Sequence, residues 1–242
     1  MKYNYKEEYN KLLNNGYTKK LIIPELLNQS DNTIIIVETR KLPHLEFVLR
    51  YSFDKLENNF WAVNIYCNLN NYDFMCKMAS SISDKINIII LDMEIKHVSD
   101  YNKLLLKKTF WKYIKAKKIL ILQEDSLIFR NGVEEYLKYD YIGAPWGNGH
   151  GKKTNLGFGN GGFSIRNVEL SYKLLNKKYK ELIRENKRLN EDIYFSIGFS
   201  KFFNENLPTI DIAKEFSVEH IKSDNPLGGH QYWICGYIPE FK

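Results

Sequence analysis

The stretch KKILILQEDSLIFRNG, residues 117–132, decides the fold that we expect for this chain. Within it, four consecutive apolar residues run directly into Gln123, Glu124 and Asp125. A strand with one face in water would alternate polar and apolar residues, so the uninterrupted run predicts a strand that is buried on both faces. Because an unpaired buried carboxylate is costly, the two acids at the end of this strand need a physical explanation.

Similar apolar runs alternate with helix-like segments before this strand. Earlier strands are predicted at 33–40, 61–67 and 86–93, and the helices between them at 43–56, 72–82 and 100–118. Pro43 suits the first turn of the first of these helices, and Asp100 is a candidate N-cap for the last. The resulting βαβαβαβ order predicts an α/β fold with a mostly parallel central sheet and helices on both faces.

The pattern changes after residue 139. Residues 140–167 are dense in glycine and aromatics, which indicates loops and short strands. A long amphipathic helix is predicted at 168–188 behind a cap at Asn167, and a second helix at 190–203. No repeat or linker interrupts the chain. We therefore expect one domain over residues 31–242, preceded by a helical extension over residues 1–30.

Composition narrows the classes of function. The 242 residues are 44% hydrophobic with a formal charge of +6, and the positive side chains are mostly spread along the chain. A nucleic-acid-binding protein needs a clustered basic stripe, so we expect no nucleic-acid partner, whereas a mild positive field suits a small anionic substrate. The three cysteines lack C-x-x-C spacing, and no signal peptide or membrane-spanning run is present. We expect a soluble cytoplasmic protein without a membrane partner.

The acids at the end of strand 118–125 are candidate site residues. Ligands of open α/β sheets bind at the carboxyl ends of the parallel strands. Side chains alternate along a strand, so Gln123 and Asp125 share one side while Glu124 points away. Two oxygen-bearing side chains at this spacing suit a hard divalent cation such as Mg²⁺ or Mn²⁺. The alternative is that Glu124 and Asp125 only cap the next turn and form salt bridges.

The first strand ends in Glu38, Thr39 and Arg40, which should line the same crevice. The glycine-rich stretch GFGNGG, residues 157–162, formally fits G-x-G-x-x-G. A dinucleotide fingerprint must directly follow the first strand and open a helix, whereas this stretch lies late in the chain and leads into a short strand. Close approach of the backbone to a ligand would explain the glycines, and so would a plain turn.

Two further groups of residues carry chemistry. Glu191 and Asp192 stand at the start of a predicted helix, where the helix dipole favours negative charge, so that helix capping is an alternative to catalysis for at least one of them. His230 lies in a glycine-rich segment near Trp233. A lone histidine is usually structural, but an imidazole here could complete a metal site begun by Asp125.

Five motifs follow one another along the chain: Q-x-D-S at 123–126, YDYIGAPW at 139–146, GNGGFSIR at 159–166, NEDIYFS at 190–196, and FSVE with PLGGH at 216–230. In this order and spacing they resemble the nucleotide-sugar glycosyltransferase family with the GT-A fold that is found in bacteria, eukaryotes and giant viruses. The resemblance covers Asn32 to Trp233. Heavy use of Lys, Asn, Ile and Tyr is compatible with a giant virus, and the chain is most similar to the family's giant-virus collagen glucosyltransferases.

The resemblance implies a metal site and a set of donor contacts. It makes Asp125 the remaining acid of a D-x-D motif, with Gln123 in place of the first aspartate and therefore one charge fewer on a bound Mn²⁺ or Mg²⁺. His230 matches a second metal ligand near the diphosphate. The residues that it implies for donor binding are Glu38, Thr39, Arg40, Gln123, Glu124, Asn160, Gly161 and Gly162.

The resemblance also implies the reaction. Glu191 and Asp192 match the acidic pair that faces the transferred sugar and the acceptor, and Asp192 is the candidate base if the enzyme inverts configuration. The collagen-glucosyltransferase likeness instead implies retention, with glucose moving from UDP-glucose to galactosyl-hydroxylysine of a collagen-like protein in the host cytoplasm or the virion. Trp146 and Trp233 could stack on acceptor sugars, although buried core tryptophans are as common.

Two other functions remain open from the residues. One is a catalytically silent module that binds a sugar or nucleotide on the same fold. The other is nucleic-acid binding, which would show a steep dependence on salt concentration. The oligomeric state is not predicted.

Overall fold

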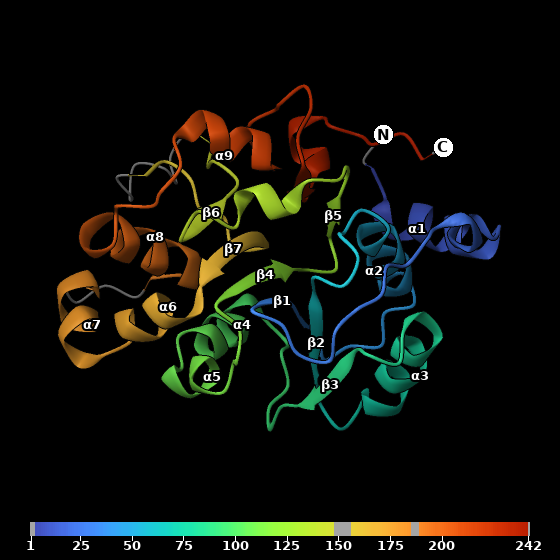
Figure 1. The fold of residues 1–242 in the computed structure, drawn as a ribbon, viewed down its shortest axis with the longest axis horizontal. Coiled ribbons are helices and arrows are strands. Elements are labelled where there is room, and N and C mark those ends of the chain that lie inside the picture. The colour runs from blue at the N-terminus through green and yellow to red at the C-terminus, as the bar shows by residue number, and fades with distance from the viewer. Residues whose placement is uncertain (1–2, 148–155, 185–188, 242) are drawn as a thin grey trace.

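The computed structural model describes residues 3–147, 156–184 and 189–241. A central six-stranded sheet has the order β3-β2-β1-β4-β7-β6, and a smaller sheet has the order β5-β9-β8. In Figure 1, helices α1–α3 gather on the right and helices α4–α8 on the left, with the strands between them. No helix in the described ranges is long and apolar enough to cross a membrane.

Four strands of the central sheet run parallel, and β7 runs antiparallel to both of its neighbours. This confirms the prediction of a mostly parallel sheet. The strands of the central sheet are β1 (Asn32–Val37), β2 (Ala62–Cys67), β3 (Asn87–Ile90), β4 (Lys118–Leu122), β6 (Tyr141–Gly143) and β7 (Phe163–Asn167). Those of the smaller sheet are β5 (Ser126–Ile128), β8 (Ser217–Val218) and β9 (Gly228–His230).

The apolar runs of β1 and β4 are uninterrupted because these two inner strands bury both of their faces. In β1, Ile34 and Ile36 belong to one hydrophobic core and Ile35 to another, since successive side chains point to opposite sides. The first core packs α2 (Leu45–Phe53) and α3 (Tyr72–Ile82) on the sheet. Helices α4 (Val98–Leu105), α5 (Lys108–Lys112) and α8 (Glu191–Phe202) pack on the other face.

The helix predicted at 100–118 is wrong in its extent, because the structure divides it into α4 and α5. Lys107 is extended there, and the carbonyl of Leu105, released from helical bonding, accepts a hydrogen bond of 2.7 Å from the indole of Trp111. Asp100 is not the N-cap. It lies in the first turn and accepts hydrogen bonds from the backbone of Lys96 and His97.

The long helix predicted at 168–188 is also divided, into α6 (Val168–Leu174) and α7 (Lys177–Arg184), and residues 185–188 lie outside the described ranges. The predicted cap is confirmed, since Asn167 accepts from the backbone of Leu170. The chain turns at Leu175, which allows α6 to pack on α5 and α7 to pack on α8.

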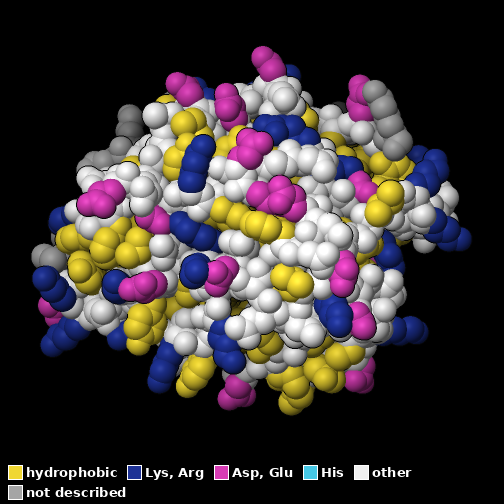
Figure 2. Space-filling view, viewed as in Figure 1, with side chains coloured by type: hydrophobic (Ala, Val, Ile, Leu, Met, Phe, Trp, Pro, Cys, Tyr) yellow, Lys and Arg dark blue, Asp and Glu magenta, His cyan; other side chains and the backbone are white. Residues whose placement is uncertain are grey.

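The remaining helical elements lie at the two ends of the chain and around the smaller sheet. They are α1 (Tyr5–Asn14), α9 (Ile210–Phe216) and the short 3₁₀ turns η1 (Tyr17–Lys20), η2 (Val133–Tyr136) and η4 (Tyr232–Cys235). Helix α1 contributes Tyr9 and Leu12 to the first core. The cysteines are free. On the face drawn in Figure 2, Lys and Arg side chains are interspersed with Asp and Glu side chains.

Candidate active site

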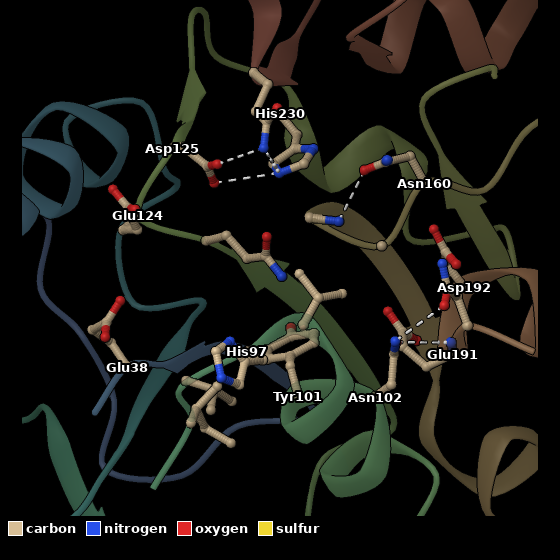
Figure 3. Close-up of a pocket in the computed structure, with 18 of the residues that line it drawn as sticks. Glu38, His97, Tyr101, Asn102, Glu124, Asp125, Asn160, Glu191, Asp192 and His230 are labelled. Carbon is tan, nitrogen blue, oxygen red and sulfur yellow. Dashed lines mark hydrogen bonds and ion pairs between the residues drawn. The ribbon is translucent and has the colours of Figure 1, made fainter. Parts of the chain in front are cut away.

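A cavity of about 390 Å³ opens at the carboxyl ends of β1 and β4. Its walls come from the ends of these strands, the start of α4, residues 160–162, the start of α8 and the end of β9. Figure 3 shows Glu38 at one end of this cavity and Glu191 with Asp192 at the other. Segments that are far apart in the sequence thus meet where open α/β sheets bind their ligands.

Asp125 and His230 face each other across one wall of the cavity, with Asp125 Oδ1 3.3 Å from His230 Nε2 (Figure 3). The smaller sheet brings them together, because Ser126 of β5 pairs with His230 of β9. Burial alone would lower the pKa of His230, but the charge of Asp125 and hydrogen bonding raise it to about 10. The same attraction outweighs the burial of Asp125 and holds the pKa of its carboxyl below the usual range.

Gln231 is a third member of this group that the sequence analysis did not single out. Its side-chain amide donates a hydrogen bond of 2.9 Å to Asp125 Oδ2, and its backbone N–H donates to the carbonyl of Asp125. Its backbone is left-handed, with φ of 43°, which is uncommon for a residue other than glycine. Strained backbone of this kind is often found at functional sites, and here it turns the side chain toward Asp125.

The donor set of this wall fits a divalent cation. A carboxylate oxygen and an imidazole nitrogen 3.3 Å apart can both contact one ion, and each belongs to the ligand types that Mn²⁺ accepts. Within the described ranges, no group of three or more His, Cys, Asp or Glu side chains could hold a metal ion. A cation here would therefore complete its coordination with water, amide oxygens or substrate phosphates, as Mg²⁺ commonly does.

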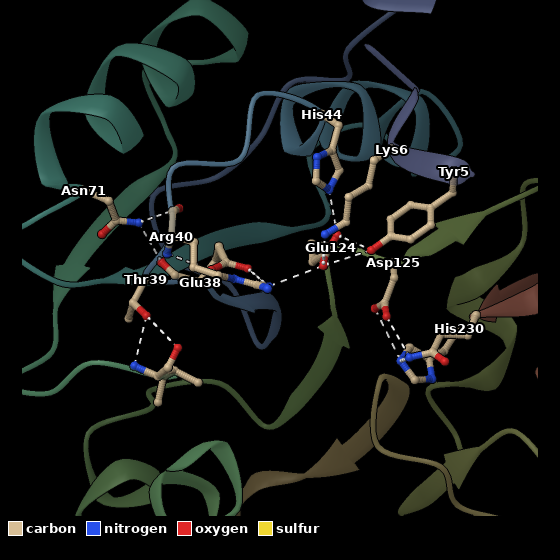
Figure 4. Close-up of polar contacts among 12 residues, drawn as sticks. Tyr5, Lys6, Glu38, Thr39, Arg40, His44, Asn71, Glu124, Asp125 and His230 are labelled. Atoms are coloured by element: carbon tan, nitrogen blue, oxygen red, sulfur yellow. Dashed lines mark hydrogen bonds and ion pairs between the residues drawn. The ribbon is translucent and has the colours of Figure 1, made fainter. Parts of the chain in front are cut away.

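Glu124 points away from this pair, into a separate cluster of polar side chains (Figure 4). It accepts hydrogen bonds from Tyr5 of α1 at 2.9 Å and from Arg40 at 3.3 Å, and lies 2.6 Å from His44 Nε2. Burial would raise the pKa of Glu124, but His44 and Lys6 lower it overall. Both acids that follow β4 therefore form ion pairs, Glu124 with Arg40 and His44 and Asp125 with His230, and both border the cavity.

The end of the first strand contributes Glu38 and Arg40 to the cavity but not Thr39. Glu38 accepts two side-chain hydrogen bonds from Arg40, at 2.8 and 2.7 Å. Thr39 instead donates to the carbonyl of Ile95 and accepts from its backbone N–H. The side chain of Asn71 holds this turn by donating to the carbonyls of Glu38 and Arg40 (Figure 4).

The glycines of the loop before β7 leave room for the site's side chains. A Cβ on Gly162 would lie 2.3 Å from His230 Cδ2, and one on Gly161 would lie 2.2 Å from Glu191 Oε1. Real Cβ atoms do not approach that closely. Asn160 accepts a hydrogen bond of 3.0 Å from the backbone of Gly162 and so shapes the loop. These glycines are therefore explained by close approach of protein side chains.

Glu191 is held in a buried ion pair. Both of its carboxylate oxygens accept from the guanidinium of Arg166, at 2.5 and 3.1 Å, and the two side chains are almost wholly buried. The backbone N–H of Glu191 donates to the side chain of Asn102, which extends from α4. A carboxylate that is fully engaged in this way is suited to holding the start of α8 in place.

Asp192, the acid next to Glu191 in the sequence, differs from Glu191. Among the residues that the structure describes, no cationic side chain forms a hydrogen bond with its carboxylate. Its carboxylate accepts from the backbone N–H of Ile193 at 2.7 Å and borders the cavity (Figure 3). Burial, together with the charge of Glu191, raises the pKa of Asp192 to about 6. A carboxyl whose pKa is close to neutral can exchange a proton with a substrate hydroxyl.

Neither of the two tryptophans assigned to acceptor sugars borders the cavity. Trp146 is buried, with 7% of its surface exposed. Trp233 stacks on Tyr5 of α1, with ring centroids 4.4 Å apart. Their role in acceptor binding stays a prediction.

A family model described as "Protein of unknown function (DUF5672)" matches residues 85–230, which is more than half of the chain. The chain belongs to this family. The matched range contains the motifs around Asp125, Gly162, Asp192 and His230, so that most of the cavity of this DUF5672 protein lies within it. No curated protein matches the sequence.

Solved structures similar to this DUF5672 protein include three glycosyltransferases. Mouse xyloside xylosyltransferase 1 in its apo form is 10% identical to this chain, with a TM-score of 0.56. The match covers 83% of this chain and 96% of the xylosyltransferase chain. Galactosyltransferase LgtC, in complex with donor and acceptor sugar analogues, is 11% identical with a TM-score of 0.57, and the match covers 82% of this chain and 86% of that one. Glycosyltransferase GlyE of Streptococcus pneumoniae TIGR4 is 12% identical with a TM-score of 0.51, covering 82% and 54%. At these identities the likeness shows the fold, which is GT-A.

Proposed function

We propose that this protein is a divalent-metal-dependent glycosyltransferase that uses a nucleoside-diphosphate sugar. The observation that carries the proposal is the pairing of Asp125 with His230 at the carboxyl end of β4, inside a cavity that also contains a protonatable acid, Asp192. The GT-A fold supports it, because this fold is shared with three structures titled as glycosyltransferases.

The residues divide the work of the reaction between the two ends of the cavity. Asp125 and His230 would hold the cation, which when bound supplies positive charge to the departing nucleoside diphosphate. Arg40, with Glu38 orienting its guanidinium, would contact the nucleotide at the end of β1. At the other end, Asp192 would position the sugar or the acceptor hydroxyl, and Glu191 with Arg166 would keep the start of α8 rigid.

We further propose UDP-glucose as the donor and galactosyl-hydroxylysine of a collagen-like protein as the acceptor, with retention of configuration. The resemblance of the sequence motifs supports this specificity. The test is a screen of UDP-sugars for Mn²⁺-dependent UDP release, with and without galactosyl-hydroxylysine, followed by NMR of the product anomer. If the acceptor stimulates UDP release only with UDP-glucose, the assignment of the donor is supported. If it stimulates release with another UDP-sugar instead, that sugar is the donor and the assignment of glucose is wrong.

A silent binding module is the alternative, and the same cavity would serve it. Such a module would bind UDP in the presence of Mn²⁺ but would release no UDP from any donor in the screen. The ionisable Asp192 favours catalysis over binding alone, because its raised pKa has no evident use in a passive site.

The rate of transfer should depend on the ionisation of Asp192. We expect activity to rise with pH through an inflection near pH 6, because Asp192 acts as a carboxylate and its pKa is about 6. Asp192→Asn should remove this inflection and keep the hydrogen bond from Ile193, since an amide oxygen can also accept it. The measurement is the pH profile of kcat/KM for both proteins, and an identical inflection in the variant would contradict the role.

The raised pKa of Asp192 also has a consequence for stability. Between pH 3.8, the ordinary pKa of an aspartate, and about pH 6, the folded state binds this proton more strongly than the unfolded state. The contribution of Asp192 to the free energy of unfolding is therefore expected to fall as pH rises through this window, and Asp192→Asn should abolish that contribution.

Gly162→Ala should impair the cation site without replacing a proposed ligand residue. The added methyl would lie 2.3 Å from Cδ2 and 2.6 Å from Nε2 of His230, so the imidazole must shift from its position. We expect weaker Mn²⁺ binding and slower UDP release, both measured at several Mn²⁺ concentrations. Thermal unfolding of the variant provides the control for folding, and unchanged Mn²⁺ dependence would show that His230 is not constrained by this glycine.

A further inference from the structure

Glu219 is a buried carboxylate on the far side of His230 from Asp125. It directly follows β8, and only 5% of its surface is exposed. Its Oε1 lies 3.3 Å from His230 Nδ1, and its Oε2 lies 3.4 Å from Nδ1 of His220. The two ring nitrogens of His230 thus face two different carboxylates, Glu219 at Nδ1 and Asp125 at Nε2.

The smaller sheet determines this arrangement. Strand β8 runs parallel to β9, and Val218 pairs with Gly229, so the next residue on each strand is Glu219 and His230. The opposite edge of β9 pairs with β5, where Ser126 is opposite His230 and directly follows Asp125. The register of three short strands therefore aligns Glu219, His230 and Asp125 in one row.

A buried carboxylate in this place requires compensation. Oε2 of Glu219 and Nδ1 of His230 are both buried, and neither makes a hydrogen bond with any residue that the structure describes. Glu219 and His230 therefore meet as an ion pair, with Glu219 Oε1 3.3 Å from His230 Nδ1. Burying the charged carboxylate of Glu219 is costly unless a nearby positive charge balances it. His230 lies next to this carboxylate and is therefore its main partner. A carboxylate on the outer nitrogen of a ligating histidine is the usual device that orients the ring and selects its tautomer.

We infer that Glu219 is a positioning residue whose carboxylate faces Nδ1 of His230, favours the tautomer that carries the proton there, and thereby presents Nε2 to a divalent cation shared with Asp125. This inference rests on the proposed metal-dependent function. It assigns a role to the glutamate of the FSVE motif, which lies eleven residues before His230. Glu219 does not border the cavity, so it would influence the cation through His230 rather than by contact.

The test measures Mn²⁺ binding directly, without nucleotide, from the electron paramagnetic resonance signal of free Mn²⁺. Glu219→Ala is expected to weaken binding by about 10–100-fold, the usual cost of losing such a partner. Glu219→Gln should recover part of the affinity, because its amide oxygen keeps an acceptor facing Nδ1. Glu215→Gln is the matched control, since Glu215 is an exposed carboxylate on the neighbouring helix α9 and should leave binding unchanged.

A second readout separates positioning from loss of structure. At saturating Mn²⁺ the Glu219→Gln variant should regain most of the wild-type rate of UDP release, with only the Mn²⁺ concentration for half-activation raised. Wild-type Mn²⁺ affinity in folded Glu219→Ala would overturn the inference. Wild-type Mn²⁺ affinity in Asp125→Ala would instead overturn the metal site of the proposed function, so the two failures are distinguishable.

Discussion

Asp125→Ala is expected to lower the rate of sugar transfer by about 10²–10³, which is roughly 3–4 kcal/mol of transition-state stabilisation. The variant would remove the proposed carboxylate ligand of the cation, and with it negative charge that would help to hold the ion in the site. His230 keeps a neighbouring carboxylate, Glu219, so the fold should survive the change.

The measurement is UDP release over a range of Mn²⁺ concentrations, together with urea unfolding of each protein. Asp125→Asn separates charge from shape, because its amide oxygen can still accept from Gln231. Asp73→Ala is a matched control, since Asp73 is an exposed aspartate in the first turn of α3 and should behave as wild type. Turnover by Asp125→Ala at the wild-type rate would remove the metal role of this residue.

Arg166→Met is expected to lower the free energy of unfolding by about 3–5 kcal/mol. The guanidinium of Arg166 is fully buried and binds both oxygens of Glu191, which is itself only 4% exposed at its side chain. The variant leaves the Glu191 carboxylate buried without its counter-charge, and an uncompensated buried charge costs far more than the net worth of the pair. We expect the start of α8, and Asp192 with it, to lose its fixed position.

The double variant Arg166→Met with Glu191→Leu is the decisive comparison. Replacing both members of a buried ion pair by apolar side chains is often nearly neutral, so the double variant should recover most of the stability lost by Arg166→Met alone. Urea unfolding of the two single variants, the double variant and the wild type forms a complete cycle. Equal stability of Arg166→Met and wild type would show that the pair is not buried as described.

Local pattern was sufficient to predict the central sheet. The strands around Ile35 and Leu120 have uninterrupted apolar runs because both faces of the inner sheet are buried, and their order along the chain implies parallel pairing. The two long helices were predicted as continuous because helical periodicity persists across Lys107 and Leu175. The breaks there depend on packing against neighbouring elements, which periodicity does not record.

The candidate site was predicted in part. Asp125 and His230 were expected to meet, and the structure brings them to 3.3 Å. The different environments of Glu191 and Asp192 were not predicted, because they depend on Arg166 from a distant strand. Arg166 does have a local signal, since it is a charged residue near the end of the short strand β7, but nothing in that signal identifies Glu191 as its partner.

By itself, the sequence determined where strands form and which polar residues stand at their ends, because side-chain alternation and burial act over a few neighbouring residues. The tertiary structure alone decided which of these residues meet. Residues 125 and 230 are brought together by the pairing of β5 with β9, and Glu219 joins them through β8. Such pairing depends on backbone hydrogen bonds, which are alike for nearly every residue type. The register between two strands that lie about a hundred residues apart therefore cannot be predicted from local sequence pattern.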